Sequence, residues 1–377
     1  MANLRLKNIK KSFAGQIALD NLNLDIEDGE FFVILGHTGA GKTTILRCIA
    51  GLEQPEQGEI YMDDELISNL SPATRDVAFV FQEHILYPHM TVYENMAFPL
   101  RPRGHSESAI NSRVVEIAEM LHIKHLLGRE PSQLSGGETQ RVGLGRAMVR
   151  QPKVFLMDEP ISALDAKLRA EMRAEIKWRQ RQTGITTLYV THDQTEAMSM
   201  ADRIAILKDG DVMQVGTATE VYHSPANLFV ADFIGNPSIN LIPCKVSAFE
   251  DEYMQISLLD HLQYQITEAE IVKQLARMDR DCELILGIHP EDISLEDIGL
   301  EDRQNMDDIS AEIYESEPLG AETIVDLNLG KSERGEMVIL KVRTSPDFDK
   351  AVGQMVAIKF DQKQLFFFDA ITGEAIR

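Results

Sequence analysis

A glycine-rich run between an apolar stretch and a helical pattern constrains this 377-residue chain more than any other feature. Residues 31–35 (FFVIL) are typical of a short buried strand, and residues 43–52 (TTILRCIAGL) are typical of a helix. The run that joins them fits the pattern G-x-x-x-x-G-K-[ST]. Its members are Gly36, His37, Thr38, Gly39, Ala40, Gly41, Lys42, Thr43 and Thr44. A strand, such a loop and a helix in succession predict a phosphate-binding loop.

The residue types in this loop suit a nucleoside triphosphate. Glycines allow successive backbone N–H groups to point inward around a polyphosphate, and the start of the helix adds partial positive charge. Lys42 can reach the β and γ phosphates, and the Thr43 hydroxyl can bind Mg²⁺. The loop therefore predicts ATP bound together with Mg²⁺.

An acidic pair closes a second apolar run, residues 154–158 (VFLMD). Asp158 at the end of this strand is placed to hold Mg²⁺, and Glu159 can polarise a water molecule for attack on the γ phosphate. Such a pair can also cap a helix or lie in a solvated loop. Its position after an apolar strand, in a chain with a phosphate loop, favours the catalytic interpretation.

Charge and cysteine content exclude several classes of protein. Asp and Glu number 60 against 37 Lys and Arg, which gives a formal net charge of −23, most of it in residues 236–377. Nucleic acids and anionic lipids need a basic face, so neither is an expected partner. The three cysteines lie far apart, which argues against disulfides and a zinc site. We find no apolar run of the roughly 18 residues that a membrane span needs and no secretory signal, and expect a cytosolic chain.

The pattern of elements changes near residue 236. Before it, residues 4–26 alternate as half-buried strands do, and apolar strands alternate with helical patterns, which favours a parallel α/β sheet. After it, short β-like runs separated by turns predict small barrels. We therefore expect two domains, residues 1–235 and residues 236–377. The expected helices are at 106–127, 135–150 and 166–182, and the further strands are at 186–192 and in a hairpin over 203–216.

The ordered set of motifs resembles the nucleotide-binding subunit of an ABC transporter over about residues 4–235. The set comprises residues 36–44, Gln82, residues 134–138 (LSGGE), Asp158-Glu159, residues 162–165 (SALD) and His192. The LSGG element discriminates this family from most phosphate-loop proteins. The resemblance implies an α/β P-loop NTPase cassette with a mixed sheet and a helical subdomain at about residues 84–150. An all-β OB-like domain of the TOBE/MOI type is then expected at the C-terminus.

The resemblance also implies a head-to-tail dimer. Each ATP would lie between the phosphate loop of one chain and Ser135, Gly136 and Gly137 of the other. The sequence agrees in one respect, because it holds one phosphate loop and one LSGG element, so a motor with two sites needs a second chain. Ser135 is well placed to cap a helix that begins at Gly136, whose N–H groups would face the γ phosphate.

Four further roles follow by position from the resemblance. Gln82 would contact Mg²⁺ and sense the nucleotide, and His192 would hold the γ phosphate and the attacking water. Asp165 would bridge the dimer interface. Phe13 would stack on adenine, the alternative being an ordinary core aromatic on an N-terminal strand. A lone histidine after a strand is usually structural, so the role of His192 depends on the resemblance.

Two residues depart from the family pattern. His37 stands where relatives often have proline, which should matter little because the backbone binds the phosphates. Glu138 stands where many relatives have glutamine. A carboxylate suits the start of a helix but would repel a γ phosphate that it faced. We therefore expect Glu138 to point outward.

Three segments resemble importers for sugars and related solutes, including maltose and glycerol-3-phosphate importer ATPases. They are residues 81–100, 225–243 and 287–293. The resemblance implies a peripheral ATPase at the cytoplasmic face of the membrane, with a second cassette, identical or paralogous, and integral permease subunits. An extracytoplasmic solute-binding protein would be an indirect partner, and the sequence does not identify the solute.

Other functions stay open at this point. The chain could serve an importer for a polyamine or an inorganic ion. It could also be a soluble ABC protein of translation or DNA repair, although these usually carry two cassettes or a long coiled coil, and basic surfaces. A third alternative is a signalling module in which the tail binds an inducer. OB-type barrels can bind oligosaccharides or oxyanions, but the acidic tail disfavours an anion and can equally hold two copies together.

Overall fold

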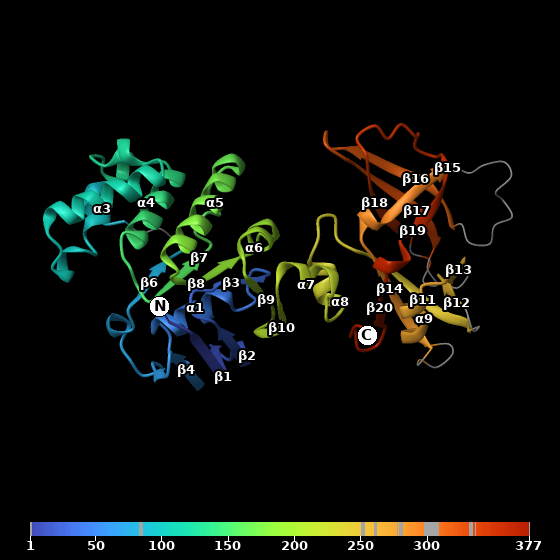
Figure 1. Cartoon of the computed structure of the whole chain (residues 1–377), viewed down its shortest axis with the longest axis horizontal. Helices are drawn as coiled ribbons and strands as arrows, with labels where there is room; N and C mark the ends of the chain where they lie inside the picture. Colours follow the sequence, from blue (N-terminus) through green and yellow to red (C-terminus); the bar gives the residue numbers. More distant parts are fainter. Residues whose placement is uncertain are drawn as a thin grey trace. The chain divides into compact units, whose positions relative to one another are not determined.

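The computed structural model describes residues 2–82, 86–249, 253–259, 262–276, 278, 282–297, 309–331, 335 and 337–376. The chain divides into two compact units, Met1–Ala218 and Thr219–Arg377 (Figure 1). Within the described part of the chain, no helix has the length and the apolar character that are needed to cross a membrane.

A six-stranded sheet forms the centre of the first unit, in the order β10-β9-β3-β8-β7-β6. All neighbouring pairs are parallel except β9 and β10, which form the expected hairpin. The strands are β3 (Phe31–Gly36), β6 (Val77–Val80), β7 (Val154–Asp158), β8 (Thr186–Thr191), β9 (Arg203–Lys208) and β10 (Asp211–Gly216). Every residue of β3, β7 and β8 is buried, as expected for parallel strands covered on both faces. The predicted parallel α/β sheet is confirmed.

A second, antiparallel sheet accompanies the first in this unit, in the order β2-β1-β4-β5. Its strands are β1 (Leu4–Phe13), β2 (Gln16–Ile26), β4 (Gln57–Met62) and β5 (Glu65–Leu66). Helix α1 (Lys42–Ala50) shares one core with both sheets, since Ile45 is fully buried in the same cluster as Leu6 and Ile34. The mixed architecture therefore encloses the helix that follows the glycine-rich loop.

Three helices pack on one another between β6 and β7 in the sequence. They are α2 (Val92–Ala97), α3 (Glu107–Met120) and α4 (Gly136–Met148), and Figure 1 shows α3 and α4 beside each other. Helix α5 (Ala166–Thr183) packs on α6 (Gln194–Met200). The predicted helices are confirmed, with one difference in length. Helix α3 ends before residue 127 because His122 adopts a left-handed backbone conformation, φ 55°, which no helix can continue.

The second unit is mostly β-structure, as the sequence predicts. Two five-stranded sheets, β13-β12-β11-β14-β20 and β15-β19-β16-β17-β18, contribute to one core. The strands are β11 (Asn240–Phe249), β12 (Met254–Leu258), β13 (Leu262–Ile266), β14 (Glu283–Ile288), β15 (Ile293–Asp297), β16 (Ile309–Pro318), β17 (Thr323–Lys331), β18 (Met337–Thr344), β19 (Met355–Phe360) and β20 (Phe366–Asp369). Among the described residues, the short α-helices after β10 are α7 (Ala218–His223), α8 (Leu228–Phe233) and α9 (Ala269–Leu275).

The expected domain boundary near residue 236 falls inside the second unit. Helix α8 belongs to this unit because its Ala231 is buried with Ile239 and Phe368. The backbone N–H of Leu228 also donates to the carbonyl of Gly373 near the end of the chain. Local packing therefore joins the segment before residue 236 to the β-rich unit.

Candidate functional site

Four segments with candidate residues lie at one edge of the six-stranded sheet. The glycine-rich loop follows β3, Gln82 follows β6, Glu159 follows β7 and His192 follows β8. Because these strands are parallel, their carboxyl ends meet at the same edge. The sheet therefore brings to one edge residues as far apart in the sequence as Lys42 and His192.

The loop between β3 and α1 requires glycine at two positions. Gly41 adopts φ 103°, and a Cβ atom there would lie 2.5 Å from the carbonyl oxygen of Ala18. A Cβ atom at Gly36 would lie 2.5 Å from the carbonyl oxygen of Leu207. Any side chain at either position would displace backbone of a neighbouring segment. The glycine pattern is thus a packing requirement of the fold.

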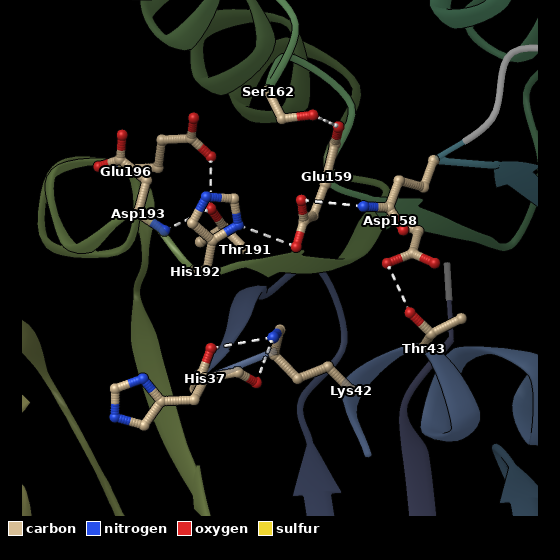
Figure 2. Close-up of polar contacts among 12 residues, drawn as sticks. His37, Lys42, Thr43, Asp158, Glu159, Ser162, Thr191, His192, Asp193 and Glu196 are labelled. Atoms are coloured by element: carbon tan, nitrogen blue, oxygen red, sulfur yellow. Dashed lines mark hydrogen bonds and ion pairs between the residues drawn. The ribbon is translucent and has the colours of Figure 1, made fainter. Parts of the chain in front are cut away.

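Lys42 is the first residue of α1, and the residue is 5% exposed. Its ammonium donates to the carbonyl oxygens of Gly36 and His37, both at 2.9 Å (Figure 2). Burial lowers the pKa of Lys42, and the negative charges of Glu159 and Asp158 act in the opposite direction. The loop backbone thus holds a cation beside its own N–H groups, an arrangement that suits a polyphosphate.

Thr43 and Asp158 form a pair of oxygen donors. The Thr43 hydroxyl donates to Asp158 Oδ1 at 3.1 Å, and Asp158 is buried at the end of β7. Burial raises the pKa of Asp158, and the hydrogen bond from Thr43 lowers it. A hydroxyl and a carboxylate are hard oxygen ligands of the kind that Mg²⁺ prefers.

The pair fits a magnesium ion that binds together with phosphate. Among the described residues, no three His, Cys, Asp or Glu side chains gather into a group that could hold a metal ion. Mg²⁺ is usually held by one or two protein ligands plus substrate phosphates and water. Thr43 and Asp158 match this pattern, rather than that of a metal site built by the protein alone.

Glu159 lies at the centre of the site, with its side chain 11% exposed. His192 Nδ1 lies 2.9 Å from Glu159 Oε1, and Figure 2 shows the two side chains facing each other. The amide of Gln82 donates to Glu159 Oε2 at 3.2 Å. The structure therefore brings Gln82 to the carboxylate, whereas the resemblance implied a contact with Mg²⁺. Residues 83–85, which follow Gln82, lie outside the described residues.

The backbone of Glu159 is in the left-handed region, with φ 45°. This conformation is unfavourable for a residue with a side chain, and it is found disproportionately at functional sites. The N–H of Glu159 donates to the carbonyl oxygen of Val190 on the neighbouring strand at 3.0 Å. The turn therefore aims the carboxylate at His192 while remaining attached to the sheet.

The segment with the LSGG element begins α4, as predicted. Ser135 is the N-cap, and its hydroxyl accepts from the N–H of Glu138 at 3.4 Å. The Glu138 carboxylate accepts from the N–H of Ser135 at 2.7 Å, which completes a capping box. These hydrogen bonds lower the pKa of Glu138. The carboxylate is thus turned back onto its own helix end, and Ser135 and Gly136 are exposed.

Asp165 and Phe13 lie at two other places in the first unit. Asp165 is the N-cap of α5, and its side chain accepts from the N–H of Leu168 at 3.0 Å. Phe13 ends β1, and its ring is 42% exposed, with Lys11 Nζ 4.9 Å from the ring centroid. The exposure does not match a core aromatic.

Sequence reasoning missed the residues that support Glu159 and His192. The buried carboxylate of Glu196 accepts from Tyr189 and Thr191, both at 2.8 Å, beneath the segment that carries His192. Asp193 caps α6, and Arg169 pairs with it at 3.2 Å. The sequence holds a weak signal for part of this arrangement. Asp193 and Glu196 are three residues apart, as an N-cap residue and the acidic residue of the first helical turn often are.

Gln140 of α4 also belongs to the missed residues. It is 1% exposed, and its amide donates to the carbonyl oxygen of Glu159 at 3.4 Å and accepts from the N–H of Ala163 at 3.1 Å. Its pattern in the sequence is that of an ordinary polar residue in a helix, so no signal marked it.

Two family models match the chain. Residues 19–162 match the ABC transporter family, and residues 286–368 match the TOBE domain. The trehalose/maltose import ATP-binding protein of Thermococcus litoralis is 45% identical, and the multiple sugar-binding transport ATP-binding protein of Streptococcus mutans is 43% identical. The sn-glycerol-3-phosphate import ATP-binding protein of Cupriavidus necator is 42% identical. Each match covers 100% of this chain and 100% of the relative.

A solved structure shares the fold of the first unit. It is described as the dimeric structure of a post-hydrolysis state of the ATP-binding cassette MJ0796 bound to ADP and Pi. The TM-score is 0.54 at 34% identity, and the match covers 57% of this chain and 98% of that chain.

Replacing Lys42 tests the phosphate loop. Lys42→Ala should weaken ATP binding roughly 10- to 100-fold, because hydrogen bonds to charged groups contribute about 1.5–3 kcal/mol. Titration with a fluorescent ATP analogue measures the affinity. Lys153→Ala is the matched control, since this lysine is 46% exposed and lies before β7, at the other end of the strand from Asp158. An affinity equal to that of the wild type in Lys42→Ala would contradict the assignment.

Replacing Glu138 tests the orientation of its side chain. Glu138→Gln should leave ATP turnover within about twofold of the wild type, because a glutamine oxygen can still accept from Ser135 in the capping box. Glu94→Gln is the matched control, since Thr91 and Glu94 form the same capping box on α2. A large rate increase in Glu138→Gln alone would show that the carboxylate faces and repels the γ phosphate.

Proposed function

The chain belongs to the ABC transporter family of ATP-binding proteins, and from this premise we propose that it drives an importer by hydrolysing ATP. The proposed solute is a sugar, a polyol or a glycerol-phosphate-type compound. The proposal depends on one observation: cationic, acidic and hydroxyl side chains meet at one edge of the parallel sheet. They are Lys42, Thr43, Asp158, Glu159 and His192. Whole-length similarity to import proteins supports transport over a soluble role in translation or DNA repair.

We assign the binding of Mg·ATP to the loop and its neighbours. Backbone N–H groups of residues 36–44 and the Lys42 ammonium would hold the phosphates. Thr43, Asp158 and Gln82 would hold Mg²⁺, and Gln82 would exchange its contact with Glu159 for the ion. When bound, Mg²⁺ neutralises phosphate charge. Phe13, exposed at the end of β1, would stack on the adenine.

We assign hydrolysis to Glu159 and His192. The Glu159 carboxylate would accept a proton from the attacking water, whose oxygen forms a bond to the γ phosphorus as the bond to the β-phosphate oxygen breaks. ADP and inorganic phosphate are the products. His192 Nδ1 lies 2.9 Å from Glu159 Oε1, and the second ring nitrogen would donate an N–H to the γ phosphate. Positioning and charge stabilisation supply most of the catalysis of phosphoryl transfer.

We propose that two chains close on two ATP molecules. The start of α4, with Ser135 at its cap and Gly136 exposed, would face the γ phosphate held by the loop of the partner. Asp165, exposed at the start of α5, would lie at the interface. The dimeric state of the similar cassette structure supports this arrangement.

We place the contact with the membrane subunits at an apolar groove of the first unit. The cavity measures about 340 Å³, and its wall includes Phe81, Tyr87, Phe98, Arg146 and Arg150. Phe81, Tyr87 and Phe98 are 38–41% exposed, a rare state for three neighbouring aromatics, and Arg146 lies 5.5 Å from the Tyr87 ring. An apolar segment of a permease subunit that carries a carboxylate fits this lining, and it would hold the chain at the cytoplasmic face.

We assign residues 236–377 a regulatory or dimerising role. The relatives match over their whole length and so include this region. The excess of acidic residues in the tail disfavours direct capture of an anionic ligand. Holding two copies together is therefore the role that we favour.

Glu159→Gln is the test of the hydrolytic assignment. The variant should bind ATP with the affinity of the wild type and dimerise, but turn over at least about 100-fold more slowly, because an amide cannot accept the proton. Phosphate release measures turnover, and size-exclusion chromatography with ATP measures dimerisation. Wild-type turnover in this variant would refute Glu159 as the general base.

Phe98→Ala is the test of the groove. The change removes an exposed ring of the groove, whose centroid lies 4.9 Å from that of Tyr87. Because Phe98 makes none of the contacts described for the ATP site, the ATPase rate of the isolated variant should stay within about twofold of the wild-type rate. Binding to the permease should weaken at least about tenfold, as for an aromatic anchor at an interface. Trp178→Ala, on the exposed face of α5, is the control. Retention of permease binding by Phe98→Ala at wild-type strength would place the contact elsewhere.

A further inference from the structure

Gln140 is a buried polar side chain that joins two functional segments of the first unit. It lies on α4, one turn after the helix start formed by Ser135, Gly136 and Gly137. Its amide nitrogen donates to the carbonyl oxygen of Glu159, and its amide oxygen accepts from the N–H of Ala163. Both halves of the amide are therefore engaged by the backbone of one segment.

That segment, residues 159–165, carries Glu159 at its start and Asp165 at its end. Its first residue has the left-handed φ of 45°, which neighbouring contacts must maintain. The hydroxyl of Ser162 also donates to the Glu159 carbonyl oxygen, at 3.1 Å, but it belongs to the same segment. Among the described residues, Gln140 alone donates to this carbonyl from outside the segment.

Helix α4 is also close to this segment at a second point. A Cβ atom on Gly137 would lie 3.3 Å from a methyl group of Leu164. The capping box of Ser135 and Glu138 closes the start of the helix, one turn before Gln140. Gln140 and Leu164 are therefore the two points at which the start of α4 lies against the segment that carries Glu159.

We propose that Gln140 is a positioning residue that couples the two ATP sites of the dimer. The start of α4 engages the ATP bound by the partner chain, whereas Glu159 acts on the ATP of its own chain. Gln140 transmits the position of α4 to the Glu159 carbonyl, so that engagement at one site sets the carboxylate at the other. This inference rests on the proposed function as an ATP-driven dimer.

The first test replaces the amide with an apolar group in the full chain. Gln140→Leu should lower kcat about tenfold, a loss typical of a catalytic group that is slightly misplaced. The affinity for a fluorescent ATP analogue should stay within about twofold, because no loop residue changes. The wild type should hydrolyse ATP with a Hill coefficient above 1, and that of Gln140→Leu should fall toward 1, since the sites no longer influence each other. An unchanged kcat and Hill coefficient would overturn the proposal.

A second variant separates the two hydrogen bonds. Gln140→Glu keeps an acceptor for Ala163, and when protonated it can also donate to the Glu159 carbonyl. When ionised it cannot donate, and its charge repels that carbonyl. Its turnover, divided by that of the wild type at the same pH, should therefore rise as the pH falls. A ratio that does not change with pH would overturn the role of the donor hydrogen bond.

A matched control removes a buried amide elsewhere. Gln180 on α5 is 7% exposed, and its amide donates to the carbonyl oxygens of Gly29 and Ile185. Gln180→Leu should lower the thermal unfolding temperature about as much as Gln140→Leu does, but leave kcat and the Hill coefficient unchanged. An equal loss of kcat in both variants would show general destabilisation and overturn the proposal.

Glu159→Gln, assayed alongside, separates a failure of the proposed hydrolytic function from a failure of the proposed coupling role of Gln140. If it turns over normally, the proposed hydrolytic function fails. If it is inactive while Gln140→Leu keeps the kcat and Hill coefficient of the wild type, the function stands and the coupling role of Gln140 fails.

Discussion

Burial of parallel strands is the constraint on which the site depends. Strands β3, β8 and β7 are adjacent in the sheet, and every one of their residues is buried, so their register is fixed by packing on both faces. Their carboxyl ends define where Gly36, Asp158 and the residue before His192 lie. The loops that follow need only to orient their side chains, because the strand ends already lie side by side. Polar groups that are distant in the sequence can therefore meet within hydrogen-bonding distance.

Around that edge, the polar groups stabilise one another's orientation. Lys42 is held by carbonyls of its own loop, Thr43 by Asp158, and Glu159 by His192 and Gln82. A further layer lies behind them, in which Glu196 supports the strand end before His192 and Arg169 binds Asp193. Such supporting contacts keep reactive groups in the geometry that phosphoryl transfer needs.

The sequence predicted the sheet and its helices, and it marked residues that meet at the sheet edge, because those features depend on local patterns. Apolar runs marked β3, β7 and β8, and glycine, lysine and acidic residues marked the ends of these strands. Short elements such as β5, with two residues, carried too little pattern to be found. Gln140 and Glu196 were missed for another reason. Their importance comes from neighbours in space, and a polar residue within a helical pattern is ordinarily solvent-exposed.

The left-handed backbone of Glu159 has a consequence for the history of this position. Glycine would adopt the same φ without strain, so selection for resistance to heat alone would favour its replacement. Glycine, however, has no carboxylate to face His192. The proposed catalytic role and the conformational stability of this turn therefore favour different residues at position 159.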